Sequence, residues 1–182
     1  MSSTTKLAFI ADIHIGNHKQ YGGAVEGSLN QRCLQTLAVL SDSVTYAVKE
    51  GCDALVILGD LFDTVRPLPQ MVAATQKILE QIPTIMLVGN HDQVSTFAHD
   101  HAMAPLLPIA EVIEESEILS YDDMDLVVVP FQPGDAKEWL GKEVDEICKQ
   151  CESDQRVLCI HLGLRDKNAP PWLQDSHDAI GS

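Results

Sequence analysis

Four short runs of apolar residues, each followed directly by polar side chains, dominate the pattern of this chain. Their length and continuity are typical of strands buried inside a sheet. The runs cover residues 7–11, 54–58, 84–88 and 157–160. The polar residues that follow them are Asp12 and His14, Asp60, Asn90 and His91, and His161. Because ligands of open α/β sheets gather beyond the carboxyl ends of the strands, we expect these side chains to share one rim.

Helical periodicity connects the first three runs. Ser28 predicts a helix N-cap, with Gln31 completing a capping box, and Gly51 predicts the end of that helix. The apolar stripe between them comprises Leu29, Cys33, Leu37, Leu40, Val44 and Val48. Pro69 suits the first turn of a second helix, which Pro83 stops. Two successive strand–helix–strand units predict a parallel sheet.

The second half of the chain predicts a hairpin and one more helix. Strands are expected over residues 111–121 and 125–130, around a turn at Asp122 and Asp123. Asp135 predicts the start of a helix whose inward face carries Leu140, Val144, Ile147 and Cys151. Residues 162–182 show little periodicity. The pair His99 and His101 has metal-binding spacing, but no strand leads into it, so a short exposed helix is favoured.

Length, charge and cysteine content narrow the class of protein. The 182 residues suit one domain, residues 1–182, and no apolar run reaches the ~20 residues that span a bilayer. The polar N-terminus lacks the apolar part of a signal peptide, which predicts a cytoplasmic protein. Five cysteines argue against a disulfide framework, and Cys148 and Cys151 are better explained as one helix face than as a zinc site.

A net charge of −15 disfavours unassisted binding to nucleic acid, whose affinity rests largely on phosphate contacts. A DNA substrate would therefore need bound metals or a basic partner. The rim residues themselves offer carboxylate, amide and imidazole donors, which suit Mn²⁺, Fe or Zn²⁺ better than Ca²⁺. Asp63, a few residues beyond Asp60, is either a direct ligand or a cap of the turn.

Paired metal ions and a nearby imidazole suit phosphoryl transfer. Two ions ~3.5–4 Å apart can clamp the attacking and leaving oxygens, and a carboxylate such as Asp60 can bridge them. His91 can carry a proton at physiological pH and would serve as a general acid, with Asp92 orienting its ring. His18 and Arg66 lie in neighbouring loops and are candidate substrate contacts, although a solvated loop residue is the alternative for each.

The motifs at residues 12–14, 59–63 and 89–92, with His161, resemble in order those of the calcineurin-like metallophosphoesterases. The resemblance implies an αββα fold: a β sandwich of two mixed sheets flanked by helices. It also implies that Asp12 and His14 hold one metal and that Asp60 bridges. Asn90 and His161 would hold the other metal, and His91 would donate a proton.

Within that family, residues 12–16 and 59–63, followed by Pro67, are similar to SbcD-type DNA repair nucleases, of which bacteriophages carry relatives. This narrower resemblance implies DNA as substrate and an SbcC-type coiled-coil ATPase as partner. It implies Mn²⁺ as the preferred metal, with Mg²⁺, Fe or Zn²⁺ as alternatives, and leaves a homodimer open. A phage-encoded protein would work in the host cytoplasm.

The sequence departs from the family at its end. The family's late Gly-His-x-His motif does not occur, and His177 is better explained as a surface residue than as a substitute ligand. We therefore expect a chain truncated before the final strands. Two alternatives to a DNA nuclease follow: an enzyme acting on a small or protein phosphoester, or a non-catalytic metal-binding fragment.

Overall fold

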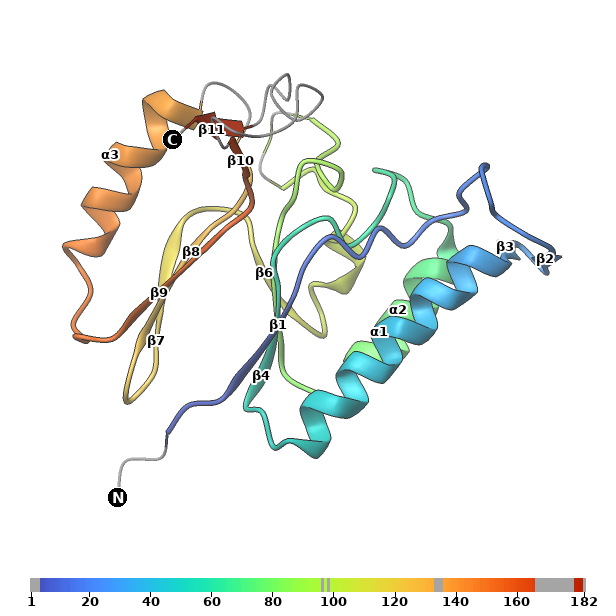
Figure 1. Ribbon diagram of the computed structural model, residues 1–182, viewed down its shortest axis with the longest axis horizontal. Helices are drawn as coiled ribbons and strands as arrows, with labels where there is room; N and C mark the ends of the chain where they lie inside the picture. Colours follow the sequence, from blue (N-terminus) through green and yellow to red (C-terminus); the bar gives the residue numbers. More distant parts are fainter. Residues whose placement is uncertain (1–3, 96, 98, 133–135, 166–178, 182) are drawn as a thin grey trace.

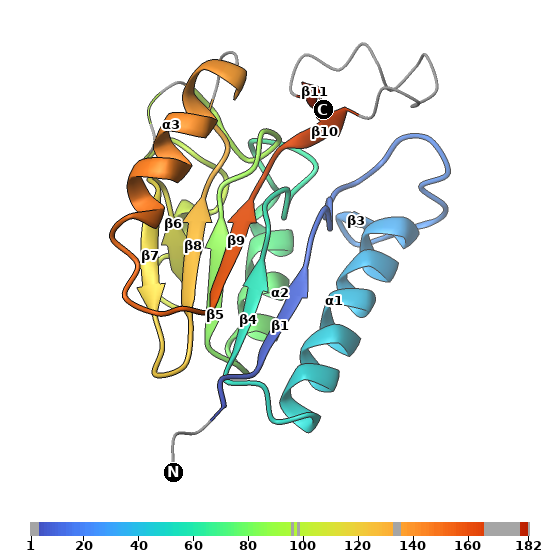
Figure 2. The same cartoon turned by 60° about the vertical axis from the view of Figure 1, so that its left-hand side comes forward.

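The computed structural model describes residues 4–95, 97, 99–132, 136–165 and 179–181. Its first sheet has the strand order β1-β4-β5-β6, and every neighbouring pair is parallel. These strands are β1 (Leu7–Ile10), β4 (Ala54–Ile57), β5 (Thr84–Leu87) and β6 (Glu111–Ile113). The three predicted N-terminal strands are therefore confirmed, and they run side by side in one direction (Figure 2).

A second, mixed sheet has the order β7-β8-β9. Its strands are β7 (Glu117–Ser120), β8 (Asp125–Val129) and β9 (Arg156–Ile160). The β7–β8 pair is the predicted hairpin, whereas β8 and β9 are parallel. Two small ribbons complete the strands: β2 (Val25–Glu26) with β3 (Leu29–Asn30), and β10 (Gly163–Arg165) with β11 (Ala179–Gly181).

In the described part of the chain, three α-helices cover the outer faces of the two sheets. Figure 1 shows α1 (Gln31–Lys49) and α2 (Pro69–Leu79) on one side and α3 (Ala136–Cys148) on the other. Alternation along the strands separates the core into layers. Leu55 and Ile57 of β4 pack toward α1 and α2, while Val56 lies between the sheets. Val127 and Val129 of β8 face α3. This αββα arrangement confirms the predicted fold class.

The start of α1 differs from the prediction. The N-cap is Asn30, whose side-chain oxygen accepts a hydrogen bond from the Cys33 backbone N–H at 2.9 Å. Ser28 is wrong as the cap because Leu29 pairs in the short β3 strand, so the helix begins after it. Val48, expected in the core, is exposed, and Ala47 is buried in its place. Gly51 has a φ of 68° and follows the helix end as predicted.

The middle and the end of the chain hold further differences. The single strand expected over residues 111–121 is divided between β6 and β7, which belong to different sheets. The exposed helix expected around His99 and His101 is wrong: His101 forms an antiparallel bridge with Gln93 and is buried. The β10–β11 ribbon was not predicted. Asp135 and His177 lie outside the described residues.

The predicted inward face of α3 is confirmed for Leu140, Val144 and Ile147, which pack on the outer face of the second sheet. Cys151 packs in the same cluster but lies beyond the helix, which ends at Cys148, so its predicted place on the helix face is wrong. Cys148 and Cys151 are half-buried free thiols. Within the described part of the chain, no helix combines the length and apolar character needed to cross a membrane.

Candidate metal centre

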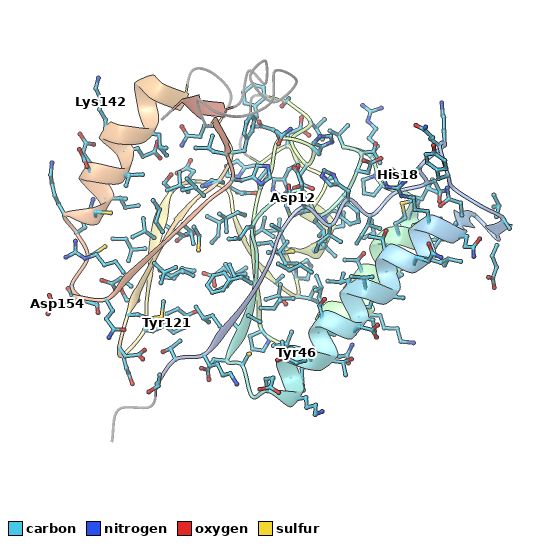
Figure 3. All side chains as sticks on the ribbon, viewed as in Figure 1. Asp12, His18, Tyr46, Tyr121, Lys142 and Asp154 are labelled. Atoms are coloured by element: carbon cyan, nitrogen blue, oxygen red, sulfur yellow. The ribbon has the colours of Figure 1, made fainter. Side chains whose placement is uncertain are left out.

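The polar residues predicted to share a rim do so. Strands β1, β4 and β5 are parallel, so Asp12, Asp60 and Asn90 leave the first sheet at the same end. Strand β9 of the second sheet ends beside them at Ile160, and His161 follows it directly. Asp12 lies at this end of the sandwich in Figure 3. Both sheets therefore deliver side chains to one place.

Asp60 lies at the centre of this group and is almost fully buried. Its Oδ1 lies 3.4 Å from His161 Nε2 and accepts a hydrogen bond from the His91 backbone N–H at 3.0 Å. Its Oδ2 lies 3.7 Å from His14 Nε2. Burial alone would raise the pKa of Asp60, but hydrogen bonds from His161 and the His91 N–H hold it below its ordinary value. The two oxygens thus face two different imidazoles, as a bridging carboxylate requires.

The surroundings of His161 fit a cation. Its Nδ1 lies 2.7 Å from the Leu58 carbonyl oxygen, so Nδ1 carries the proton and Nε2 is the nitrogen left for a ligand. Nε2 lies 2.9 Å from Asn90 Oδ1. With Asp60 Oδ1, three acceptor atoms meet here, and a proton or a metal ion between them relieves their repulsion. Burial lowers the pKa of His161, but the carboxylate of Asp60 raises it further, which favours positive charge at this point.

A second group of donors lies on the other side of Asp60. Ligand atoms of Asp12, His14 and Asp60 lie within 4.8 Å of one another, as do those of His14, Asp63 and His91. His14 Nδ1 is buried without a hydrogen-bond partner and lies 3.9 Å from Asp63 Oδ1. A ring nitrogen in that position suits coordination or a charged neighbour. Asp63, left open by the sequence, therefore lies at the edge of the same cluster.

His91 and Asp92 have separate surroundings. The exposed His91 ring meets the edge of His14, with centroids 4.8 Å apart. Asp92 is fully buried, and its two oxygens accept hydrogen bonds from the backbone N–H groups of Phe62 and Gly89, at 3.2 and 3.1 Å. Burial outweighs these bonds and raises its pKa to about 6. Among the described contacts Asp92 joins the loops after β4 and β5, rather than orienting His91 as expected.

Backbone geometry marks the same residues. Asp12, His14 and Asp60 have φ values of 52°, 50° and 51°, a left-handed conformation that L-residues adopt at a cost. Two glycines allow the close approach. A Cβ on Gly59 would lie 2.2 Å from His161 Nδ1, and one on Gly89 would lie 2.3 Å from Asp60 Oδ1. The sequence showed these glycines only as turn residues, and it carried no signal for the strained φ angles.

The two candidate substrate contacts are placed differently. His18 adjoins the cluster, with Nδ1 3.3 Å from Asp63 Oδ2 and Nε2 3.1 Å from the His14 carbonyl oxygen. Arg66 is exposed, and its described contact is a backbone bond to Thr64 Oγ1 at 3.3 Å. The structure thus brings His18 to the rim and leaves Arg66 without a described contact to it.

The pair with metal-binding spacing has another use. His101 Nε2 lies 2.8 Å from Glu114 Oε1, and His99 Nδ1 pairs with the other oxygen of the same carboxylate. These contacts attach the loop that carries His99 and His101 to Glu114, the residue after β6. Glu114 is the residue that sequence reasoning missed, because a lone acid after a strand has no distinctive pattern.

An αββα sandwich whose strand ends gather carboxylates, an amide and imidazoles is the architecture of a metal-dependent hydrolase. The chain belongs to the calcineurin-like phosphoesterase family, whose family model matches residues 5–180. That membership makes it a phosphoester hydrolase by class and implies divalent metal ions, for which the donor groups described above are suited.

Individual relatives are more distant. The chain is 26% identical over 179 residues to the DNA double-strand break repair protein Mre11 of Sulfurisphaera tokodaii, covering 90% of this chain and 42% of that protein. It is 25% identical over 181 residues to Mre11 of Archaeoglobus fulgidus, covering 88% and 39%. The chain therefore spans less than half the length of these relatives.

Two solved structures are similar at lower identity. The nuclease MPE of Pseudomonas putida matches at 19% identity with a TM-score of 0.41, covering 70% of this chain and 55% of that one. A protein of unknown function from Aquifex aeolicus matches at 15% identity with a TM-score of 0.45, covering 98% and 89%.

Proposed function

We propose that this chain is the catalytic domain of a nuclease that hydrolyses phosphodiester bonds of DNA with a pair of divalent metal ions. The observation that carries the proposal is the placement of Asp60, whose two oxygens face His161 on one side and His14 on the other. DNA as the substrate is supported by the SbcD-like motifs and by the names of the Mre11 relatives.

In this proposal each side of Asp60 holds one ion. Asp12 and His14 would bind the first, Asn90 and His161 the second, and Asp60 would bridge them. The bound ions would supply positive charge that offsets the charge developing on the phosphate oxygens. Leu58 contributes through its carbonyl, which keeps the proton of His161 on Nδ1 and directs Nε2 into the site.

His91 would move the proton. Its ring is exposed, so it can reach a substrate, and contact with the His14 ring places it beside the donor cluster. Its backbone N–H donates a hydrogen bond to Asp60 Oδ1, which fixes the position of the His91 backbone beside the donor cluster. Hydroxide would bond to phosphorus as the P–O bond to the leaving group breaks, and protonated His91 would give its proton to the leaving oxygen. Asp92 would act from behind by fixing the two loops that carry Asp60 and His91.

The finer expectations from the resemblance stay proposals. Mn²⁺ would be the preferred ion, and an SbcC-type coiled-coil ATPase would be the partner that supplies positive charge for DNA. A homodimer, a cytoplasmic location and the boundaries of the domain also remain predictions from the sequence.

The test is cleavage of labelled single-stranded and duplex DNA by the purified chain with Mn²⁺, together with the number of ions bound per chain. We expect two ions, loss of metal and activity in Asp60→Asn, and a fall in turnover of about 10²–10⁴-fold in His91→Ala with metal retained. Asp42→Asn, the same chemical change on the exposed face of α1, is the matched control.

Three results would contradict the proposal in different ways. Full activity of Asp60→Asn or His91→Ala would reject the mechanism. Hydrolysis of nucleotides or a chromogenic diester without cleavage of DNA would favour a small phosphoester substrate. Tight metal binding with no hydrolysis of any of these substrates would identify a metal-binding module without catalysis.

A further inference from the structure

A hollow of about 550 Å³ lies next to the metal centre, at the N-terminal end of α1. We call it the cationic hollow and define it by Lys19, Tyr21, Arg32, His18 and Asp63, which line it. Figure 3 shows His18 at the same end of the molecule as Asp12, beside the first turn of α1. The two sites share Asp63, whose Oδ1 faces His14 while its Oδ2 faces His18.

The charge of the hollow is opposite to that of the whole chain. The protein has 27 acidic against 12 basic residues, and its net charge of −15 repels polyanions. Lys19 and Arg32 are both exposed, and within the described part of the chain neither forms an ion pair. Asp63 is engaged by His18 at 3.3 Å. Two cations are thus left facing solvent beside the cluster that would hold the reacting phosphate.

The loop that carries these residues is held in one shape. Asn30 Nδ2 donates to the His18 carbonyl oxygen at 2.9 Å, and the Asn30 N–H donates to Asn17 Oδ1 at 2.8 Å. The Arg32 N–H donates to the Gly22 carbonyl at 3.1 Å. A Cβ on Gly22 would lie 2.4 Å from the His18 carbonyl oxygen, so the turn leaves room only for glycine. A loop fixed in this way lowers the cost of ordering its backbone on binding.

Tyr21 is the aromatic side chain of the hollow. It is 83% exposed and has a φ of 58°, a left-handed conformation that costs energy in a residue other than glycine. The fold therefore holds a large aromatic ring in water at the mouth of the hollow. Exposed aromatic rings next to lysine and arginine are the parts from which binding sites for single-stranded nucleic acid are built, because a base stacks on the ring while phosphates meet the cations.

We propose that the cationic hollow is a subsite for the DNA strand adjoining the phosphate that is hydrolysed. Lys19 and Arg32 bind phosphate oxygens of that strand, and Tyr21 stacks on a base. The first three backbone N–H groups of α1 are not available to bind a phosphate. They already donate hydrogen bonds to the carbonyl oxygens of Ala24 and Gly22 and to the side chain of Asn30. The inference rests on the proposed function, because it assigns the direction in which a DNA substrate leaves the metal centre.

The experiment measures fluorescence anisotropy of a labelled oligothymidylate of about 15 nucleotides, with Ca²⁺ replacing Mn²⁺, over a series of salt concentrations. Lys19→Gln/Arg32→Gln should weaken binding at least tenfold and reduce the slope of log K against log[salt] by about 1.4, or ~0.7 for each phosphate contact. Lys49→Gln/Lys77→Gln removes the same charge at the far ends of α1 and α2 and is the control. Thermal unfolding of each variant shows that it is folded.

The stacking role of Tyr21 has its own readout. Tyr21→Ala should lower the affinity for the oligothymidylate about 5- to 100-fold, whereas Tyr21→Phe should retain it. An abasic oligonucleotide has no base to stack, so the wild type and Tyr21→Ala should bind it equally. Equal affinity of wild type and Tyr21→Ala for the oligothymidylate would overturn the assignment of this residue.

Cleavage by the wild type with Mn²⁺, measured in parallel, separates the two proposals. If the wild type cuts DNA while Lys19→Gln/Arg32→Gln and the control pair bind DNA alike, the cationic hollow is not a DNA subsite and the proposed function stands. If the wild type does not cut DNA, the proposed function fails, and the anisotropy comparison alone then decides whether the hollow binds a DNA strand.

Discussion

Replacing Gly59 by alanine should damage the metal centre through His161. The added Cβ would lie 2.2 Å from His161 Nδ1, well inside contact distance, and the φ of 91° already disfavours any side chain. The imidazole has to move, because the backbone on the other side of the contact belongs to the end of β4. Moving it breaks the 2.7 Å hydrogen bond from Nδ1 to the Leu58 carbonyl and turns Nε2 away from Asp60.

The size of the effect follows from these contacts. A left-handed φ costs an L-residue about 1–2 kcal/mol. Alanine also reduces the conformational entropy of the unfolded chain relative to glycine, which offsets about 0.4–1 kcal/mol of that cost. The lost hydrogen bond adds about 0.5–1.5 kcal/mol, and crowding at the ring adds about 1–3 kcal/mol. Gly59→Ala should therefore lower the free energy of unfolding by about 2–6 kcal/mol. It should also weaken Mn²⁺ binding by at least ~10–100-fold, as expected when the support of a ligand is lost.

Gly51→Ala is the matched control. Gly51 has a φ of 68°, but a Cβ there would meet nothing within 4 Å, so this variant carries the backbone cost without the crowding. It should lose about 1 kcal/mol of stability and bind Mn²⁺ like the wild type. Urea denaturation and isothermal titration with Mn²⁺ measure the two quantities. If Gly59→Ala matches Gly51→Ala in both, the close contact with His161 plays no part in metal binding.

Three further substitutions or treatments test other contacts. Asn30→Ala should cost about 1–2 kcal/mol of stability in urea denaturation, whereas Ser28→Ala should cost little, because the cap of α1 is Asn30. Burial raises the pKa of Glu114, but its two histidine partners lower it further, so its folded pKa lies below the unfolded value. Glu114→Gln should therefore lose about 1–2 kcal/mol at neutral pH, and its difference from the wild type should vanish as pH falls through the lowered pKa. Burial raises the pKa of Cys33, and that of Cys159 to about 11, so both thiols should resist alkylation at pH 8 until the protein unfolds.

The strands and their polar ends could be read from the sequence because buried strands of a layered α/β fold have continuous apolar runs. Each run also ended in a residue type that a buried strand exit would not otherwise hold. That combination placed Asp12, Asp60, Asn90 and His161 on one rim before any distance was known. The helix stripes were readable for the same reason, since α1 and α2 bury one face each.

Boundaries and partners were harder to predict because competing contacts decide them. Ser28 and Asn30 are both good capping residues, and only the pairing of Leu29 with Glu26 in the β2–β3 ribbon selects between them. The partners of Asp92 are backbone N–H groups of Phe62 and Gly89, which have no signature in a sequence. A motif places Asp92 next to His91 along the chain, but the fold turns its carboxylate into the protein.

The strained residues connect stability with function. Three of the residues proposed as ligands, Asp12, His14 and Asp60, hold left-handed φ angles, at a cost of about 1–2 kcal/mol each. Such angles persist only where neighbouring contacts enforce them. Here the loops after β1 and β4 hold each other: the His14 N–H donates to the Asp60 carbonyl at 3.0 Å. Contacts between the two loops thus hold both of them in the strained conformation. A substitution in either loop should therefore disturb both proposed metal positions.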